Sequence, residues 1–181
     1  MNSATDIIRD EHREIARILH TLEDLAENEE VLARGIKSGL IASMLHYLRV
    51  FPYAIHHPKE EKALFPAVAA KDGKTLVAVM AALVKDHAIA YALLREIEVA
   101  MGQSGTAAGI ARLKEAILKY IGHKRRHIER EEGEILPIAE RILDAENCAA
   151  LKKSFTAGAH SKTGKDMRSE FEALFHHGQK K

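Results

Sequence analysis

Residues 127–137 read HIEREEGEILP, and residues 56–66 read HHPKEEKALFP. Both stretches contain the spacing H-x-x-x-E, which pairs His127 with Glu131 and His56 with Glu60. In an α-helix, residues four positions apart lie on the same face, about one turn from each other. Each pair can therefore offer one ring nitrogen and one carboxylate to the same point in space, which predicts two helices that share a polar site.

Two further histidines, His12 in DEHREI and His87 in KDHAIAY, lie in other helix-like segments. Helical bundles build two-metal sites by converging such groups from four helices. A donor set of imidazoles and carboxylates without cysteine favours iron, and two carboxylates on facing helices can bridge two ions. The sequence thus predicts a non-haem di-iron centre with six metal ligands: His12, His56, Glu60, His87, His127 and Glu131.

Nearly the whole chain reads as helix, because the alternation of β-branched residues that is typical of strands is absent. Long helices are predicted at about residues 3–29, 40–71, 75–101 and 110–143, with residues 30–38 mostly loop and residues 102–109 a flexible link. Shorter helices are predicted at about residues 147–158 and 165–176. At about 1.5 Å rise per residue, antiparallel neighbours bring the ligand groups to one level.

The fold class is therefore all-α, an up-down four-helix bundle over residues 1–143. Residues 144–181 are expected to form a short helical C-terminal extension that packs on the bundle or trails from it. Three prolines interrupt the second long helix, and Pro58 lies between His56 and Glu60, so it is expected to distort the helix at the site. Alternatively, Pro52 begins a new helix after a break.

The composition is that of an ordinary soluble globular domain: 181 residues, 46% hydrophobic, 29% charged, net charge +1. This balance gives no electrostatic case for nucleic acid or an anionic membrane as a partner. No secretory signal and no apolar run long enough to span a bilayer are predicted. The single cysteine, Cys148, excludes an intramolecular disulfide, and a cytoplasmic location is expected.

Two other metal motifs are absent, namely E-x-x-H and H-E-x-x-H. The register of the site stays open, because His57 with Glu61 repeats the four-residue spacing about 100° further round the helix. Glu132 is likewise an alternative to its neighbour Glu131. His123 lies one turn before His127, which makes it a further candidate ligand.

The chain resembles the hemerythrin-like family, often called HHE cation-binding domains, in the strings DEHREI, HHPKEEKALFP, KDHAIAY and HIEREEGEILP. The resemblance spans residues 1–143. It implies a four-helix bundle with two irons bridged by carboxylates and an oxo or hydroxo group, and ligands at the six positions named above. It favours His56 over His57, because the family spacing aligns on the first histidine. Family members bind or respond to dioxygen, nitric oxide or peroxide, or handle iron.

The sequence departs from the oxygen-carrying hemerythrins at Tyr91, where those proteins place a second histidine four residues after the one in the third helix. Water, substrate or another side chain then fills the remaining metal positions. Tyr91 and Tyr53 are candidates for that ligand, and core packing with a hydrogen-bonded hydroxyl is the alternative for both. A phenolate ligand would favour peroxide or nitric oxide chemistry, or sensing, over oxygen storage.

The first functional hypothesis is a di-iron protein that binds or turns over a small oxygen-containing ligand: dioxygen, peroxide or nitric oxide. If the protein is an enzyme, we expect a peroxide- or nitric-oxide-directed oxidoreductase. The alternative is a non-catalytic sensor or iron-handling module that signals through metal or ligand occupancy to a protein or redox partner. A third interpretation is a structural bundle whose ligands are vestigial or hold zinc.

Overall fold

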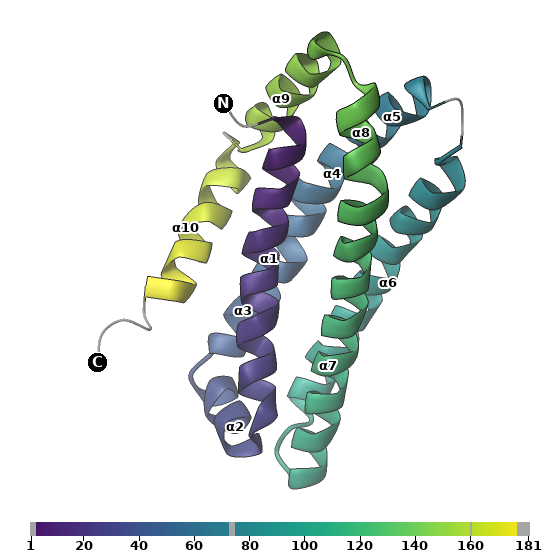
Figure 1. The fold of residues 1–181 in the computed structure, drawn as a ribbon. Coiled ribbons are helices and arrows are strands. Elements are labelled where there is room, and N and C mark those ends of the chain that lie inside the picture. The colour runs from purple at the N-terminus through teal and green to yellow at the C-terminus, as the bar shows by residue number, and fades with distance from the viewer. Residues whose placement is uncertain (1–2, 73–74, 160, 177–181) are drawn as a thin grey trace.

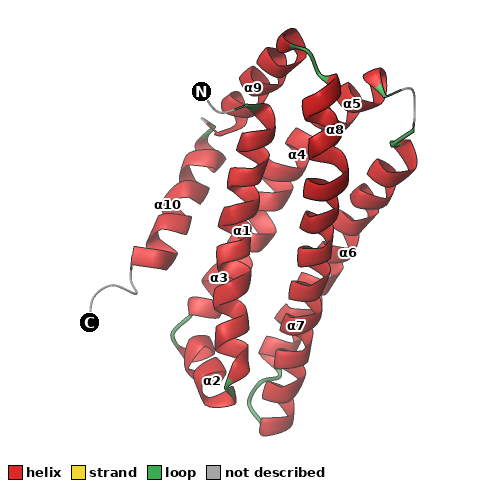
Figure 2. Ribbon diagram, viewed as in Figure 1, coloured by secondary structure: helices red, strands yellow, loops and turns green. Residues whose placement is uncertain are grey.

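The computed structural model describes residues 3–72, 75–159 and 161–176, and all regular structure in these ranges is helical (Figures 1 and 2). This confirms the all-α class. The first long helix is α1 (Ala4–Glu27) and the third is α6 (Val77–Gly102). The second helical run, residues 40–71, consists of α3 (Leu40–Phe51), η1 (Pro52–His56), α4 (His57–Lys59), η2 (Glu60–Leu64) and α5 (Phe65–Lys71), where η marks a π-helical turn. The fourth run, residues 107–142, consists of α7 (Ala107–Arg130), η3 (Glu131–Ile135) and α8 (Leu136–Ile142).

The four runs pack side by side: α1 contacts α3 and α7, and α6 contacts the same two helices. In Figure 1, α1 and α7 lie next to each other on the near side of the molecule. The core consists of two apolar clusters, one around Ile8, Leu64, Leu83 and Ile135, the other around Ile15, Ile55, Ala90 and Ile121.

A polar layer separates these two clusters along every run. α1 passes from Ile8 in one cluster through His12 to Ile15 in the other. The second run crosses in the opposite order, from Ile55 to Leu64, and the order alternates again in α6 and α7. Consecutive runs are therefore antiparallel, and their ligand positions share one level, as the rise per residue predicts.

The helix between the first two long runs was not expected. The structure has α2 (Glu29–Lys37) where the sequence predicts mostly loop over residues 30–38. Asn28 caps this helix, because its side-chain oxygen accepts hydrogen bonds from two first-turn backbone N–H groups. Leu32 and Gly35 are buried, so tertiary packing stabilises the short helix. Gly39, with φ +76°, then turns the chain into α3.

A proline lies two residues after the end of each π turn that the structure describes. The i→i−5 hydrogen bonds are donated by the backbone N–H groups of His57, Phe65 and Leu136, and a proline follows each donor. A proline cannot donate, and its ring clashes with the carbonyl four residues earlier, which widens the helix. The expected distortion at Pro58 is thus present, and Pro52 continues the helix rather than beginning a new one.

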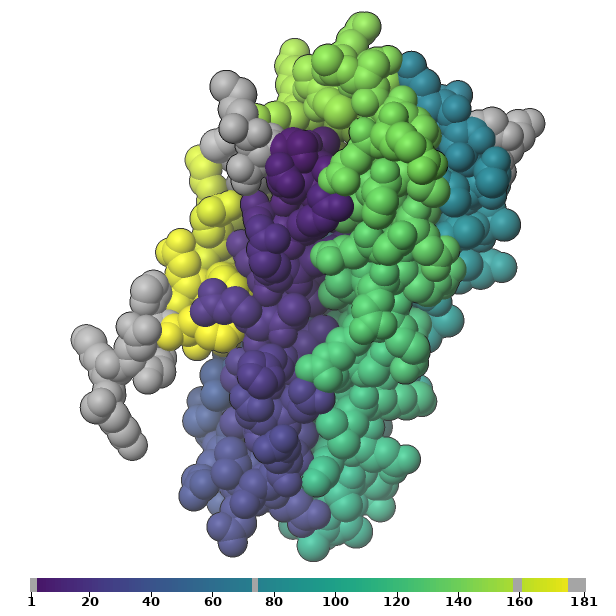
Figure 3. Space-filling model, in the orientation of Figure 1, coloured from purple at the N-terminus to yellow at the C-terminus, as the bar shows by residue number. Residues whose placement is uncertain are grey.

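The C-terminal residues form α9 (Ala145–Ala159) and α10 (Lys162–His176), which contact α1 and α3, respectively. Figure 3 shows α10, in yellow, lying against the surface beside α1. Met167 and Phe171 of α10 are buried in the apolar cluster of α3, and the Arg17 guanidinium lies 5.2 Å from the centroid of the Phe171 ring. The described part of the extension therefore packs on the long helices.

By length and composition alone, α6 could cross a membrane, with a mean hydropathy of 1.6 in its most apolar 18-residue window. The expectation that no apolar run is long enough to do so is therefore wrong for this helix. Its buried face packs on α3 and α7, and it carries His87 into the polar layer. The core helix of a soluble protein passes the same test, so the finding is weak evidence for a membrane.

Candidate metal centre

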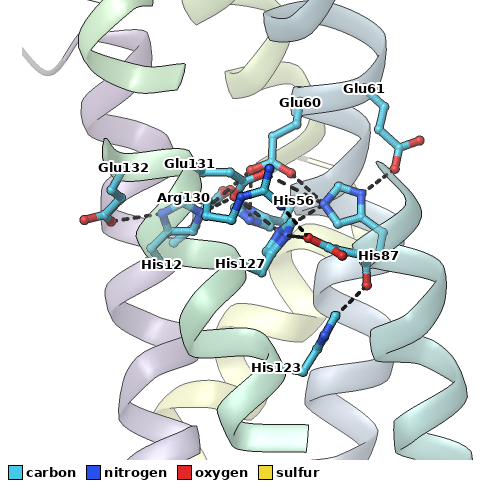
Figure 4. Close-up of polar contacts among 12 residues, drawn as sticks. His12, His56, Glu60, Glu61, His87, His123, His127, Arg130, Glu131 and Glu132 are labelled. Carbon is cyan, nitrogen blue, oxygen red and sulfur yellow. Dashed lines mark hydrogen bonds and ion pairs between the residues drawn. The ribbon is translucent and has the colours of Figure 1, made fainter. Parts of the chain in front are cut away.

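The structure brings together all six ligand residues that the sequence predicts. Figure 4 shows their side chains converging from four helical runs on one point between the two apolar clusters. They form two groups of potential ligand atoms, each within 4.8 Å of one another: His12, His56, Glu60 and Glu131 in one, and His87, His127 and Glu131 in the other. The rings of His12 and His56 lie 4.9 Å apart, and those of His87 and His127 lie 4.7 Å apart.

The two glutamates lie between the two histidine pairs. Glu60 places Oε1 3.2 Å from His56 Nε2 and Oε2 3.4 Å from His87 Nε2. Glu131 places Oε2 3.2 Å from His12 Nε2 and 3.3 Å from His127 Nε2, with Oε1 3.9 Å from His87 Nε2. Each carboxylate therefore faces both pairs, which is the arrangement that bridging ligands require.

The donor atoms are buried, and most of them lack a hydrogen-bond partner within the described chain, the exceptions being Nε2 of His87 and Nε2 of His127, which lie 3.2 Å apart. All four carboxylate oxygens of Glu60 and Glu131, and Nε2 of both His12 and His56, have no such partner within the described chain. Both glutamates and both histidines are at most 1% exposed. Unpaired buried polar atoms destabilise a fold, so native structures rarely keep them without a bound group. The residues present fit a metal pair.

Carboxylates also face the outer nitrogens of the histidine rings. Nδ1 of His12 lies 3.0 Å from Glu132, Nδ1 of His56 lies 3.0 Å from Glu11, and Nδ1 of His87 lies 2.6 Å from Glu61. Because a carboxylate accepts, each Nδ1–H donates and Nε2 keeps its lone pair for a metal.

The fourth histidine, His127, follows this pattern at longer range. Its Nδ1 lies 3.8 Å from Asp86, outside hydrogen-bonding distance. Asp86 is held by Arg130, whose Nη1 lies 3.2 Å away, and Glu11 is held in the same way by Lys59.

These supporting groups reveal an internal repeat that the sequence analysis missed. The second and fourth runs share the pattern H-x-x-[KR]-E-E-x-x-x-x-P, beginning at His56 and His127. An acidic residue directly precedes the histidine in both α1 (Glu11) and α6 (Asp86). The sequence does show the supporting carboxylates, as adjacent Glu-Glu, Glu-His and Asp-His pairs. It does not show which histidine each one supports, because that histidine lies on another helix.

Burial and neighbouring charges shift the pKa values of the cluster. Burial and the nearby Glu131 carboxylate raise the pKa of Glu60 to about 8. Burial alone would lower the pKa of His12, but the facing carboxylates of Glu131, Glu132 and Glu60 outweigh it and raise that pKa well above its usual value. Burial lowers the pKa of His56, and the charges of His12 and Lys124 lower it further. Without metal, the site holds protons that a metal must displace.

The two registers at the second run lie in different surroundings. His56 and Glu60 lie in the cluster, whereas His57 stacks on the His87 ring at 3.6 Å and Glu61 bonds to that same ring. His57, Glu61 and His87 form a third group of potential ligand atoms.

The remaining candidates lie outside the cluster. Tyr53 and Tyr91 are 72% and 45% exposed, with ring centroids 6.2 Å apart, and neither belongs to a group of potential ligand atoms in the described residues. Nε2 of His123 lies 2.9 Å from the backbone carbonyl of Asp86, to which it can donate (Figure 4). That bond ties α7 to the backbone of α6 beside His87.

The fold and site define an all-helical protein with a buried, carboxylate-supported cation site. The family described as Hemerythrin HHE cation binding domain matches residues 3–139, and the chain belongs to it. Comparisons with curated proteins and with solved structures find no match.

Proposed function

We propose that the chain is an up-down four-helix bundle that holds two non-haem irons, and that these bind or turn over a small oxygen-containing ligand, namely dioxygen, peroxide or nitric oxide. The observation that carries the proposal is the pair of buried carboxylates, each facing two histidine pairs with every oxygen unpartnered. His12 and His56 would hold one iron, His87 and His127 the other, and Glu60 and Glu131 would bridge them.

The protein groups have defined roles in this proposal. Four carboxylates from neighbouring helices face the outer ring nitrogens of the four histidines and orient the rings. The two apolar clusters exclude bulk water above and below the polar layer. When bound, an iron pair supplies reversible electron transfer to a ligand at an open coordination position.

The site geometry favours water or an external ligand over tyrosine at that position, since Tyr53 and Tyr91 are exposed and lie outside the cluster. Replacing Tyr91 with Phe should therefore leave the visible spectrum of the iron-loaded protein unchanged. A lost or shifted band would instead assign the phenolate as a ligand.

Turnover measurements separate the two functional candidates. The iron-loaded protein is mixed with hydrogen peroxide or nitric oxide, and the consumption per chain is measured. Repeated consumption beyond the iron content supports an oxidoreductase. Stoichiometric binding accompanied by a change in hydrogen exchange of α9 and α10 supports the alternative, a sensor or iron-handling module. That alternative is favoured by the packing of these helices against α1 and α3, which carry or adjoin ligand residues.

A further inference from the structure

A cavity of about 680 Å³ lies between the second run and α6, next to the metal centre. Its walls are largely apolar and include Leu48, Pro52, Val84 and Leu94, together with the rings of Tyr53 and Tyr91. Pockets for organic ligands fall in the range of about 300–1,000 Å³ and combine apolar walls with a few convergent polar groups. Dioxygen, peroxide and nitric oxide need only a small part of this space.

The exposure of the lining residues shows which end of the cavity is open to solvent and which end is closed. Tyr53 and Tyr91 are 72% and 45% exposed, so they mark its open end. Tyr120 and Lys124, which reach it from α7, are each 1% exposed and mark its closed end. His87 lines the same cavity, so the closed end adjoins the metal centre.

Two polar groups of the closed end have no partner. Lys124 Nζ and His57 Nε2 are both buried and make no hydrogen bond within the described chain. The other charged groups of the wall are either paired or exposed. Arg49 donates to Glu98 at 2.9 Å, Glu61 bonds to His87, and Lys62 is exposed. The carboxylates of Glu131, Glu60 and Asp86 attract the charge of Lys124 but do not hydrogen-bond to it. A buried ammonium without a hydrogen-bond partner is unfavourable, and an anionic head group in the cavity would supply one.

Neither of these two residues belongs to the repeated pattern. The position three residues before the repeated histidine is Lys124 in the fourth run but Tyr53 in the second. The position just after that histidine is His57 in the second run but Ile128 in the fourth. His56, Glu60, His127 and Glu131 of the repeat lie in the metal centre, whereas Lys124 and His57 both line the cavity.

We propose that this cavity binds an organic monoanion with an apolar body, such as a medium-chain or aromatic carboxylate, whose head group pairs with Lys124. His57 Nε2 is the second polar group available to the head, and the body lies between the tyrosines and the aliphatic wall. The site goes beyond the proposed ligand chemistry and does not depend on iron.

The test is calorimetric titration of the full-length protein as purified, with its metal content measured, using octanoate and its uncharged counterpart octanamide. We expect one octanoate per chain, bound at least tenfold more tightly than octanamide. Lys124→Met should abolish this preference while octanamide binding persists. Lys119→Met is the matched control, because Lys119 lies on the same helix but is exposed and paired with Glu96, and it should bind octanoate like the unmodified protein.

Folding of the variants is checked by thermal unfolding, and methionine is chosen at position 124 because it keeps an unbranched side chain in the buried position without the charge. Ala88→Trp provides a second variant, because it fills the cavity from the exposed side of α6 and should block octanoate without changing the helix content. The proposal is overturned if octanoate does not bind, if both probes bind equally, or if Lys124→Met or Ala88→Trp keeps the preference. Iron content is measured separately, so failure of the di-iron proposal is distinguishable.

Discussion

Each of the four clustered histidines lies between two carboxylates, an inner one that faces Nε2 and an outer one that faces Nδ1. The inner glutamates can bind metal, whereas the outer carboxylates of Glu132, Glu11 and Glu61 accept from Nδ1 and fix the ring and its tautomer. At the scale of single residues, the outer groups can therefore be tested separately from the ligands.

Glu132→Gln removes the charge behind His12 and keeps a side chain of similar size. We expect the affinity for Fe(II) to fall by about 10- to 100-fold, with the number of bound ions unchanged at saturation. Anaerobic titration against a competing chelator measures this change. Glu129→Gln, at an exposed position on the same run, is the control. Equal affinities for the two variants would contradict the assigned role of Glu132.

The raised pKa of Glu60 predicts how the stability of the metal-free protein depends on pH. Because the folded-state pKa is about 8 and the ordinary value is 4.5, the folded state binds this proton more tightly than the unfolded state does. The stabilising contribution is full below about pH 4.5 and is lost as pH rises through 8. Urea unfolding should show that the unmodified protein loses stability relative to Glu60→Gln across this window. A difference that does not vary with pH would refute the shift.

The clustering of the candidate ligands was predictable from sequence because His56 with Glu60 and His127 with Glu131 lie within single helical runs. Periodicity alone fixes their shared face. The outer carboxylates were not predictable, because Glu11, Glu61 and Glu132 each support a histidine on another run. Likewise, only the fold shows that Lys124 and His57 line one cavity.

At the scale of helices, the long elements match the predicted ones to within a few residues, although apolar periodicity is strong only in α1, α3 and α7 and is weak in α6. Two features differ in detail. α2 forms where loop was expected because Leu32 packs into the core, and α7 begins at Ala107, which shortens the expected link. The apolar periodicity also does not predict the π turns, although the prolines that follow them are visible in the sequence.

The docking of α10 gives a prediction at this scale. Phe171 is 8% exposed, and its ring centroid lies 5.6 Å from that of Tyr47. Phe171→Ala should lower the free energy of unfolding by about 3 kcal/mol, as for other buried aromatic residues. The half-buried Phe175 should give a smaller loss on the same change. Urea unfolding checks both variants, and an unchanged midpoint for Phe171→Ala would show that α10 is not docked in solution.

At the scale of the whole molecule, the polar layer divides the core into two apolar clusters and leaves buried carboxylates unpaired. Metal binding should therefore stabilise the entire fold, because the folded state alone presents the assembled site. At a free metal concentration of about 1,000 times Kd, the expected gain is about 4 kcal/mol. Removing iron with a chelator should lower Tm, and restoring Fe(II) should recover it. The variant Glu60→Ala, Glu131→Ala should show no such recovery, and recovery in that variant would place the metal elsewhere.

The most direct test of the account is the metal content of the untagged protein, measured together with its visible spectrum before and after addition of azide. We predict two irons per chain and an absorption band that azide changes, and fewer than two irons in both Glu60→Ala and Glu131→Ala. Zinc or no metal, with no colour after anaerobic loading with Fe(II), would contradict the di-iron centre. Two irons retained in both variants would contradict the bridging assignment.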